Sequence, residues 1–144
     1  MTNAETSIAE GLARAHIALL RDLQELDEAG RPASNHDLAA LRAHLEATRA
    51  HLVEHFRFEE VDGYMTAVRT REPRLERTVD ELANEHGQLL SSLDALLAET
   101  ATDLGLDQAM RAKVSQWINR VRQHEARENH LIQDIFNLDI GSED

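Results

Sequence analysis

A stripe of inward-facing residues between Leu38 and Glu59 is the feature that most constrains this chain. Its members follow one another at intervals of three and four residues, which places them on one face of an α-helix. They are Leu38, Leu41, Leu45, Thr48, Leu52, His55 and Glu59. A stripe of leucines that finishes with an imidazole and a carboxylate needs an explanation, because an unpartnered polar group in a core costs several kcal/mol. The sequence therefore predicts partners for His55 and Glu59 inside the fold.

Three further segments carry apolar stripes of helical spacing, and polar residues interrupt each of them. The first runs from about residue 7 to 28 and consists of Ala9, Leu12, His16, Leu19, Leu23 and Leu26. The next consists of Leu75, Val79, Leu82, His86, Leu89, Leu93 and Leu96. The last consists of Met110, Val114, Trp117, Val121, His124, Glu128, Leu131 and Ile135. Each predicted helix thus brings one histidine to its inner face, and two helices add a glutamate four residues later.

Short connectors separate the four predicted helices. Gly30 and Pro32 mark the first connector, Gly63 ends or bends the second helix, and Pro73 begins the third. A further helical turn is expected through 65–70. The candidate N-caps are Ser34, in a capping box with Asp37, and Asp103 or Asp107. With no strand pattern competing, the sequence predicts an all-α, up-down-up-down four-helix bundle. We expect a single domain over residues 1–144, with a core of about 7–136 and a frayed acidic tail at 137–144.

The topology of such a bundle brings the polar interruptions together, because they lie at similar distances from the turns that join neighbouring helices. Six side chains are expected at one depth: His16, His55, Glu59, His86, His124 and Glu128. The first hairpin fits less well, and we expect the second helix to extend about two turns beyond the first.

The chemistry of the six side chains points to a dinuclear metal site. The chain contains no cysteine, so nitrogen and oxygen atoms must hold any metal, which suits iron, manganese or zinc. Two carboxylates on opposing helices can each bridge a pair of ions. Without metal, two buried carboxylates would raise each other's pKa, whereas two divalent cations neutralise them and keep the histidines neutral. We therefore expect metal to stabilise the fold.

The charge of the chain limits its partners. The formal net charge is −12, and the basic residues are scattered, which argues against nucleic acid and anionic membranes. The first ten residues lack the features of a secretory signal, and no apolar run is long enough for a membrane span. A cytoplasmic protein is therefore expected. The sequence identifies no protein partner.

The arrangement of these residues resembles that of the hemerythrin-like, or HHE cation-binding, domain. The resemblance covers about Ile8 to Phe136 and rests on His16 and on the segments HFRFEE, EHGQLL and HEAREN. It implies a non-haem, carboxylate-bridged centre of two iron ions, with zinc or manganese as possible substitutes. It also implies four terminal ligands, His16, His55, His86 and His124, and two bridging ligands, Glu59 and Glu128.

One departure from the family pattern bears on function. Oxygen-carrying hemerythrins place two histidines four residues apart on the third helix, but Leu82 and Leu90 stand four residues before and after His86. With one ligand fewer, about two coordination positions stay open, spread over both metals. Such a site resembles the branch of the family linked to nitric oxide, peroxide or iron handling, and it puts reversible oxygen carriage in doubt.

The sequence is compatible with three candidate functions. The leading one is a di-iron protein that binds or reduces oxygen, peroxide or nitric oxide, with its standing as an enzyme left open. The second is an iron sensor or store without turnover, whose metal-dependent order a partner reads. The third is a metal-free network of buried histidines and glutamates. Two other classes of metal site are excluded. Ferritin-like di-iron sites use Glu-x-x-His, which does not occur in this sequence. The HExxH motif of zinc proteases would begin at His124, but position 128 is a glutamate instead of the second histidine.

Several neighbours of the predicted ligands have less certain roles. Glu60 turns away from the stripe, and Asp62 is expected to accept a hydrogen bond behind the ligands rather than to bind metal. Tyr64 either packs or donates to a small molecule at the open positions. The other histidines are expected at the surface or behind the ligands: His36, His44, His51 and His130.

Overall fold

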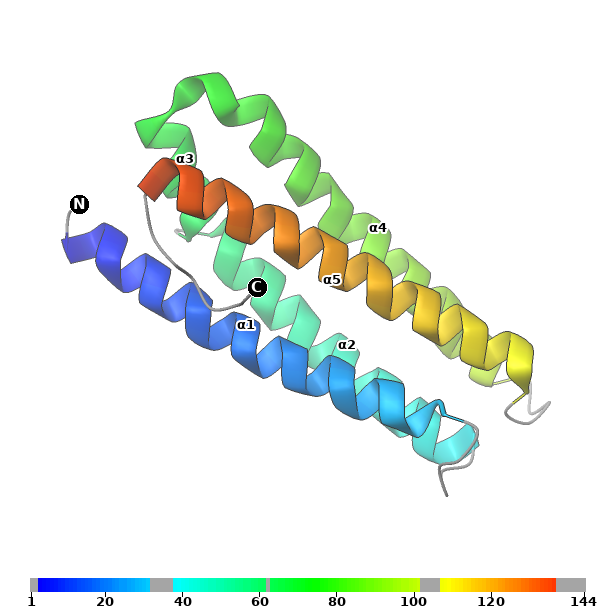
Figure 1. The fold of residues 1–144 in the computed structure, drawn as a ribbon. Coiled ribbons are helices and arrows are strands. Elements are labelled where there is room, and N and C mark those ends of the chain that lie inside the picture. The colour runs from blue at the N-terminus through cyan, green and yellow to red at the C-terminus, as the bar shows by residue number, and fades with distance from the viewer. Residues whose placement is uncertain (1–2, 32–37, 62, 102–106, 137–144) are drawn as a thin grey trace.

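The computed structural model describes residues 3–31, 38–61, 63–101 and 107–136, and these ranges contain helices and no strand. Four long helices form an antiparallel bundle (Figure 1). They are α1 (Asn3–Ala29), α2 (Leu38–Glu60), α4 (Glu76–Thr100) and α5 (Gln108–Phe136). Two short elements join α2 to α4: helix α3 (Tyr64–Arg71) and the 3-10 turn η1 (Pro73–Leu75). The predicted all-α four-helix bundle is confirmed. No described helix combines the length and apolar character that crossing a membrane requires.

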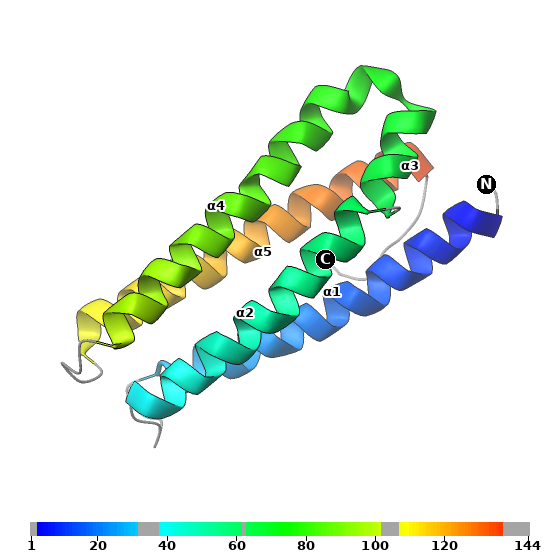
Figure 2. The same ribbon diagram turned by 180° about the vertical axis from the view of Figure 1, so that it is seen from behind.

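The long helices surround one interior. α1 packs against α2 and α5, and α4 packs against the same two helices from the other side. Seen from either face, α3 lies at the end of the bundle where α1 begins and α5 ends (Figures 1 and 2). It contacts all four long helices there. The turn expected through 65–70 is therefore a helix of its own that covers one end of the bundle.

Local signals account for several helix boundaries. The carboxylate of Asp107 accepts a hydrogen bond from the Met110 backbone amide at 2.9 Å, which confirms this residue as the N-cap of α5. Gly63 precedes α3, where an added Cβ would lie 2.2 Å from the Phe58 carbonyl oxygen. Pro73 starts η1, and α4 follows from Glu76. Three of the predicted caps lie outside the described residues, as does the acidic tail: Ser34, Asp37, Asp103 and residues 137–144.

The predicted stripes of α1, α2 and α4 are buried, apart from Leu75, which is half-buried in η1. On α5 the prediction was wrong after Glu128. Leu131 and Ile135 are half-buried, whereas Ile132 and Phe136 are buried. The inner face of α5 follows a seven-residue repeat, as helices that wrap around one another do, and this repeat carries burial from Ile118 to Ile132.

Two apolar clusters occupy the interior, and the polar residues separate them along the bundle. The larger one, here called the leucine cluster, fills the end away from α3 and includes Leu23, Leu26, Leu41, Leu45, Leu93, Val114 and Trp117. The smaller one, here called the α3 cluster, consists of Leu12, Tyr64, Met65, Val68, Val79, Leu82, Ile132 and Phe136. On α1, α4 and α5, the buried histidine lies between residues of the two clusters, whereas on α2 His55 lies between Leu52 and Phe56 of the leucine cluster.

The offset predicted for the first hairpin depends on residues 32–37, which lie outside the described residues. Within the described residues, His16 lies 13 residues before Ala29, and His55 lies 17 residues after Leu38. The centroids of the two imidazole rings are 5.3 Å apart.

Candidate metal centre

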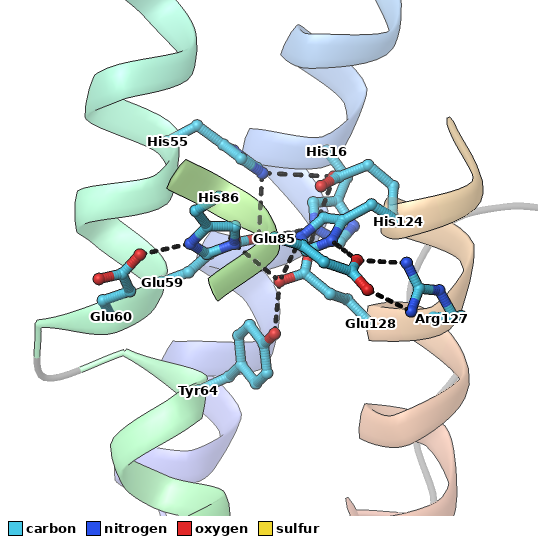
Figure 3. Close-up of polar contacts among 11 residues, drawn as sticks. His16, His55, Glu59, Glu60, Tyr64, Glu85, His86, His124, Arg127 and Glu128 are labelled. Atoms are coloured by element: carbon cyan, nitrogen blue, oxygen red, sulfur yellow. Dashed lines mark hydrogen bonds and ion pairs between the residues drawn. The ribbon is translucent and has the colours of Figure 1, made fainter. Parts of the chain in front are cut away.

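The structure brings all six predicted side chains together in one buried layer. α1 supplies His16, α4 supplies His86, and α2 and α5 each supply a histidine with a glutamate one turn later (Figure 3). Every one of the six is at most 7% exposed. The four-residue spacing works as expected, because residues one helical turn apart project from the same side of the helix. The predicted members of this polar layer are His16, His55, Glu59, His86, His124 and Glu128.

Glu59 divides its two carboxylate oxygens between two sets of histidines. Its Oε2 lies 3.2 Å from Nε2 of His16 and 3.0 Å from Nε2 of His55. Its Oε1 lies 3.1 Å from Nε2 of His86, on the opposite side. One carboxylate therefore faces imidazoles from three helices.

Glu128 divides its oxygens in the same way. Its Oε2 lies 3.5 Å from Nε2 of His86 and 3.3 Å from Nε2 of His124. Its Oε1 faces the other side and lies 3.9 Å from Nε2 of His16. Both carboxylates thus join the same two pairs of histidines, as bridging ligands between two ions would.

The donor atoms form two groups, and within each group they lie within 4.8 Å of one another. The first group consists of His16, His55, Glu59, Glu125 and Glu128. The second consists of Glu59, His86, His124 and Glu128. The two predicted bridging residues are the members that the groups share.

Many of these buried atoms have no hydrogen-bond partner among the described residues. They include Nε2 of three histidines and one oxygen of each shared glutamate: His55, His86, His124, Glu59 and Glu128. The nitrogen and oxygen atoms approach closely but mostly without the angles of hydrogen bonds. Buried polar groups are normally satisfied, so this set of lone pairs directed at shared space fits bound cations.

Without metal, the carboxylates hold the imidazoles in their charged form. Burial opposes the charge on His16, but the carboxylates of Glu125 and Glu59 outweigh it and raise the pKa of His16 to about 11. The same balance raises the pKa of His55 to about 10. In the second pair, burial again opposes the charge, and Glu128 and Glu59 raise the pKa of His86 to about 10.

The shared carboxylates respond in the opposite direction. Burial and the charge of Glu128 favour the neutral form of Glu59, yet the surrounding histidines lower the pKa of Glu59 overall. Burial likewise disfavours the Glu128 carboxylate, and His124 and His86 nevertheless hold its pKa well below the usual range. Without metal, the layer is therefore a network of imidazolium and carboxylate charges, and bound cations would replace its protons.

Two further glutamates orient the histidines of the second group. Nδ1 of His86 contacts the carboxylate of Glu60, and Nδ1 of His124 lies 2.7 Å from Oε1 of Glu85. Arg127 binds the far oxygen of Glu85 at 2.6 Å, and the pKa of Glu85 is lowered because this guanidinium and His124 together outweigh its partial burial. Such acceptors fix the ring so that Nε2 points at the metal position. Glu60 does turn away from the stripe, but it turns toward His86.

Aromatic side chains complete the surroundings of the layer. The hydroxyl of buried Tyr64 donates a hydrogen bond to Oε2 of Glu128 (Figure 3). Burial and the nearby carboxylates raise the pKa of Tyr64 above its ordinary value, so the hydroxyl keeps its proton. Phe56 stacks on His86, with ring centroids 3.8 Å apart and planes within 6° of parallel. Tyr64 therefore both packs and donates, to a carboxylate of the site itself.

One member of the layer was missed from the sequence. Glu125 is 5% exposed, and its Oε1 lies 3.0 Å from Nε2 of His16 and 3.3 Å from Nε2 of His55. The three- and four-residue spacing selected His124 and passed over its neighbour. The seven-residue spacing from Ile118 to Glu125 and on to Ile132 was the signal that could have found it.

The remaining candidates lie away from the layer. His51 is exposed and pairs with Asp22 at 2.8 Å, and His130 is exposed near Asp134. Neither belongs to the two donor groups. His36 and Asp62 fall outside the described residues.

The fold and the layer together define a class: helical bundles that hold metal through histidine and carboxylate side chains of all their long helices. A family model described as the hemerythrin HHE cation binding domain matches residues 7–136. The chain therefore belongs to the hemerythrin HHE cation-binding family, as its motifs indicated. The searches of curated proteins and of solved structures gave no match.

Proposed function

We propose that this chain is a non-haem di-iron protein that binds or reduces a small oxidant such as oxygen, peroxide or nitric oxide. The observation that carries the proposal is the division of Glu59 and Glu128 between two pairs of histidines. A single ion would not need both oxygens of both carboxylates to face opposite sides. Two ions would, because each bridging carboxylate gives one oxygen to each ion.

The geometry supports a division of ligand roles in this proposal. His16 and His55 would hold one ion, His86 and His124 the other, and Glu59 and Glu128 both. Zinc or manganese suits the same donors, so the identity of the metal is part of the proposal. Bound iron would supply redox chemistry and coordination positions that a small molecule can take.

The protein around the layer has three tasks in this proposal. Glu60 and Glu85 hold His86 and His124 so that Nε2 faces inward. Tyr64 holds one oxygen of Glu128 through its hydroxyl proton. The leucine cluster and the α3 cluster keep bulk water from both ends of the layer.

A second candidate is an iron sensor or store without turnover. It is favoured by the position of the charged layer between two apolar clusters, where bound metal would order both halves of the bundle. A partner protein would then read the iron-dependent change in order.

The experiment is anaerobic reconstitution with ferrous iron, followed by metal analysis and optical spectra before and after adding oxygen, peroxide or nitric oxide. The proposed function predicts two iron ions per chain, spectral changes with at least one oxidant, and its binding or consumption. Strong iron-dependent stabilisation with no oxidant bound or consumed would favour the sensor or store. A chain that binds no iron, with a melting temperature that chelators leave unchanged, would contradict both and leave the metal-free network.

A further inference from the structure

We infer that Glu125 is a terminal ligand to one metal position only, so that the two positions are chemically unequal. The inference rests on the proposed di-iron function and deepens it. It assigns to the His16–His55 ion a fifth protein donor, and it leaves the His86–His124 ion with four donors and more room for a small molecule.

The carboxylate of Glu125 lies beside one pair of histidines only. Its carboxylate approaches the histidines of the first pair at 3.0 and 3.3 Å, which is as close as Glu59 approaches them. It joins the donor group of His16 and His55 and is absent from the group of His86 and His124. In α5, two adjacent residues therefore serve different groups: His124 faces the second and Glu125 the first.

The same carboxylate is buried without a hydrogen-bond partner in the described part of the chain. Glu125 is 5% exposed, and neither of its oxygens has a hydrogen-bond partner of acceptable geometry among the described residues. Among the described residues, its ion-pair partners are the imidazoles of His16 and His55, with no arginine or lysine among them. A buried carboxylate needs a partner for its charge, and a cation between His16 and His55 would provide one.

A surface groove reaches His55, but it does not make the His16–His55 position the more accessible of the two. A groove of about 460 Å³ between α1 and α2 is lined by His55 together with Ala15, Ala18 and Phe58. His55 turns its Nε2 away from solvent toward Glu59 and Glu125, so the groove ends at the imidazole ring. The number of protein donors, five against four, remains the feature that distinguishes the two positions.

The absence of a fifth histidine beside His86 predicted open positions at both metals. Glu125 supplies a fifth terminal donor, but on the other ion. The histidine that is missing from the His86–His124 ion is thus not replaced there. Because the additional donor binds the His16–His55 ion instead, the two ions have unequal numbers of protein ligands.

The test compares the wild-type chain with Glu125→Gln after loading with iron-57 under anaerobic conditions. Two Mössbauer doublets are expected in the wild type, and Glu125→Gln should alter one of them and weaken binding of that ion at least about tenfold. Glu54→Gln is the matched control, since Glu54 is exposed and adjacent to His55 as Glu125 is adjacent to His124. It should alter neither doublet.

Nitric oxide then tests which ion has the room. Added to the wild-type di-iron protein, it should first change the doublet that Glu125→Gln leaves unaltered. Two irons bound in Glu125→Gln with unchanged affinity and unchanged doublets would overturn the inference while leaving the di-iron function standing. Nitric oxide acting first on the doublet that depends on Glu125 would overturn the assignment of the open position. A wild-type chain that binds fewer than two irons would instead contradict the proposed function itself.

A crossed pair of variants covers the case in which the doublets overlap. His86→Ala leaves the first group intact, and His55→Ala leaves the second; circular dichroism checks that both variants fold. Adding Glu125→Gln should weaken the remaining iron in the His86→Ala background and should have no effect in the His55→Ala background. Equal effects in both backgrounds would contradict a one-sided ligand.

Discussion

The bridging role of the shared glutamates gives the first prediction. Replacing Glu59 or Glu128 by alanine should remove at least one metal ion per chain, because each carboxylate faces both pairs of histidines. Metal analysis after reconstitution measures the loss. Glu54→Ala, on the exposed side of α2, should keep full occupancy. Full occupancy in the Glu59→Ala/Glu128→Ala double variant would refute the bridging role.

The hydroxyl of Tyr64 gives the second prediction. Tyr64→Phe keeps the ring in the α3 cluster and removes the hydrogen bond to Glu128. The metal-free protein should lose about 1 to 3 kcal/mol of unfolding free energy, because a buried carboxylate oxygen loses its donor. Urea denaturation with and without metal measures the change. An unchanged midpoint in the metal-free protein would show that this hydrogen bond contributes nothing to stability.

At the scale of elements, α3 is the part whose existence was least determined by its own sequence. Eight residues are too few for a stable helix in isolation, so its order comes from packing against the four long helices. Gly63 and Pro73 indicated the two boundaries. The contact between Tyr64 and Glu128 could not be predicted, since it depends on how α3 folds back over the layer.

Gly63 therefore gives an element-scale prediction. A Cβ at this position would lie 2.2 Å from the Phe58 carbonyl oxygen and 2.6 Å from that of Glu59. Gly63→Ala should displace the start of α3 and lower the unfolding free energy by about 1 to 3 kcal/mol. Gly87→Ala is the control, because the position is inside α4 and, apart from the adjoining backbone of this helix, no atom lies within 4 Å of its added Cβ.

The control has an expected direction of its own. Alanine is the better helix former, so Gly87→Ala should raise the unfolding free energy by about 0.5 to 1 kcal/mol. Thermal or urea unfolding of both variants measures the contrast. Equal effects of the two substitutions would show that the close approach at Gly63 relaxes without cost.

For the whole molecule, protons and metal compete for one layer, and pH should move stability and metal affinity in opposite directions. In the metal-free fold, the pKa values of His16, His55 and His86 are raised to about 11, 10 and 10. The stability that this shift contributes is fully present below pH 6.5, the ordinary pKa of histidine. This contribution is lost as the pH rises through about 10. The lowered pKa values of Glu59 and Glu128 contribute above their ordinary value of 4.5, and that contribution is lost as the pH falls.

The metal-free protein should thus be most stable between about pH 4.5 and 6.5 and should weaken above that range. Metal needs neutral imidazoles, so its affinity should rise as the pH increases above about 6.5, where the metal-free fold weakens. The difference in melting temperature between metal-loaded and metal-free protein should be larger at about pH 9 than at about pH 6. Scanning calorimetry with and without a chelator measures it, and a difference that shrinks with pH would contradict the competition.

The overall architecture was predictable because four long stripes, short connectors and no strand pattern leave few alternatives to an antiparallel bundle. The offset between α1 and α2 stays a prediction, because the connecting residues 32–37 lie outside the described residues. Within the polar layer, the cost of burying an imidazole or a carboxylate without a partner predicted six of the seven residues. Glu125 was missed because the predicted stripe of α5 did not follow the seven-residue repeat. The acceptors Glu60 and Glu85 could not be predicted from the sequence either. They project from between the stripes, and only the packed bundle shows which histidine each one meets.

The separation of the leucine cluster from the α3 cluster has a consequence for how the molecule opens. In the metal-free protein the charged layer separates the smaller α3 cluster from the leucine cluster, so amide hydrogens of α3 and of the adjoining helix ends should exchange faster than those beside the leucines. Filling the layer would couple the two regions, and exchange should then slow most at the α3 end. Loss of the bound metal would first cause local opening at the α3 end of the bundle, before the remainder unfolds.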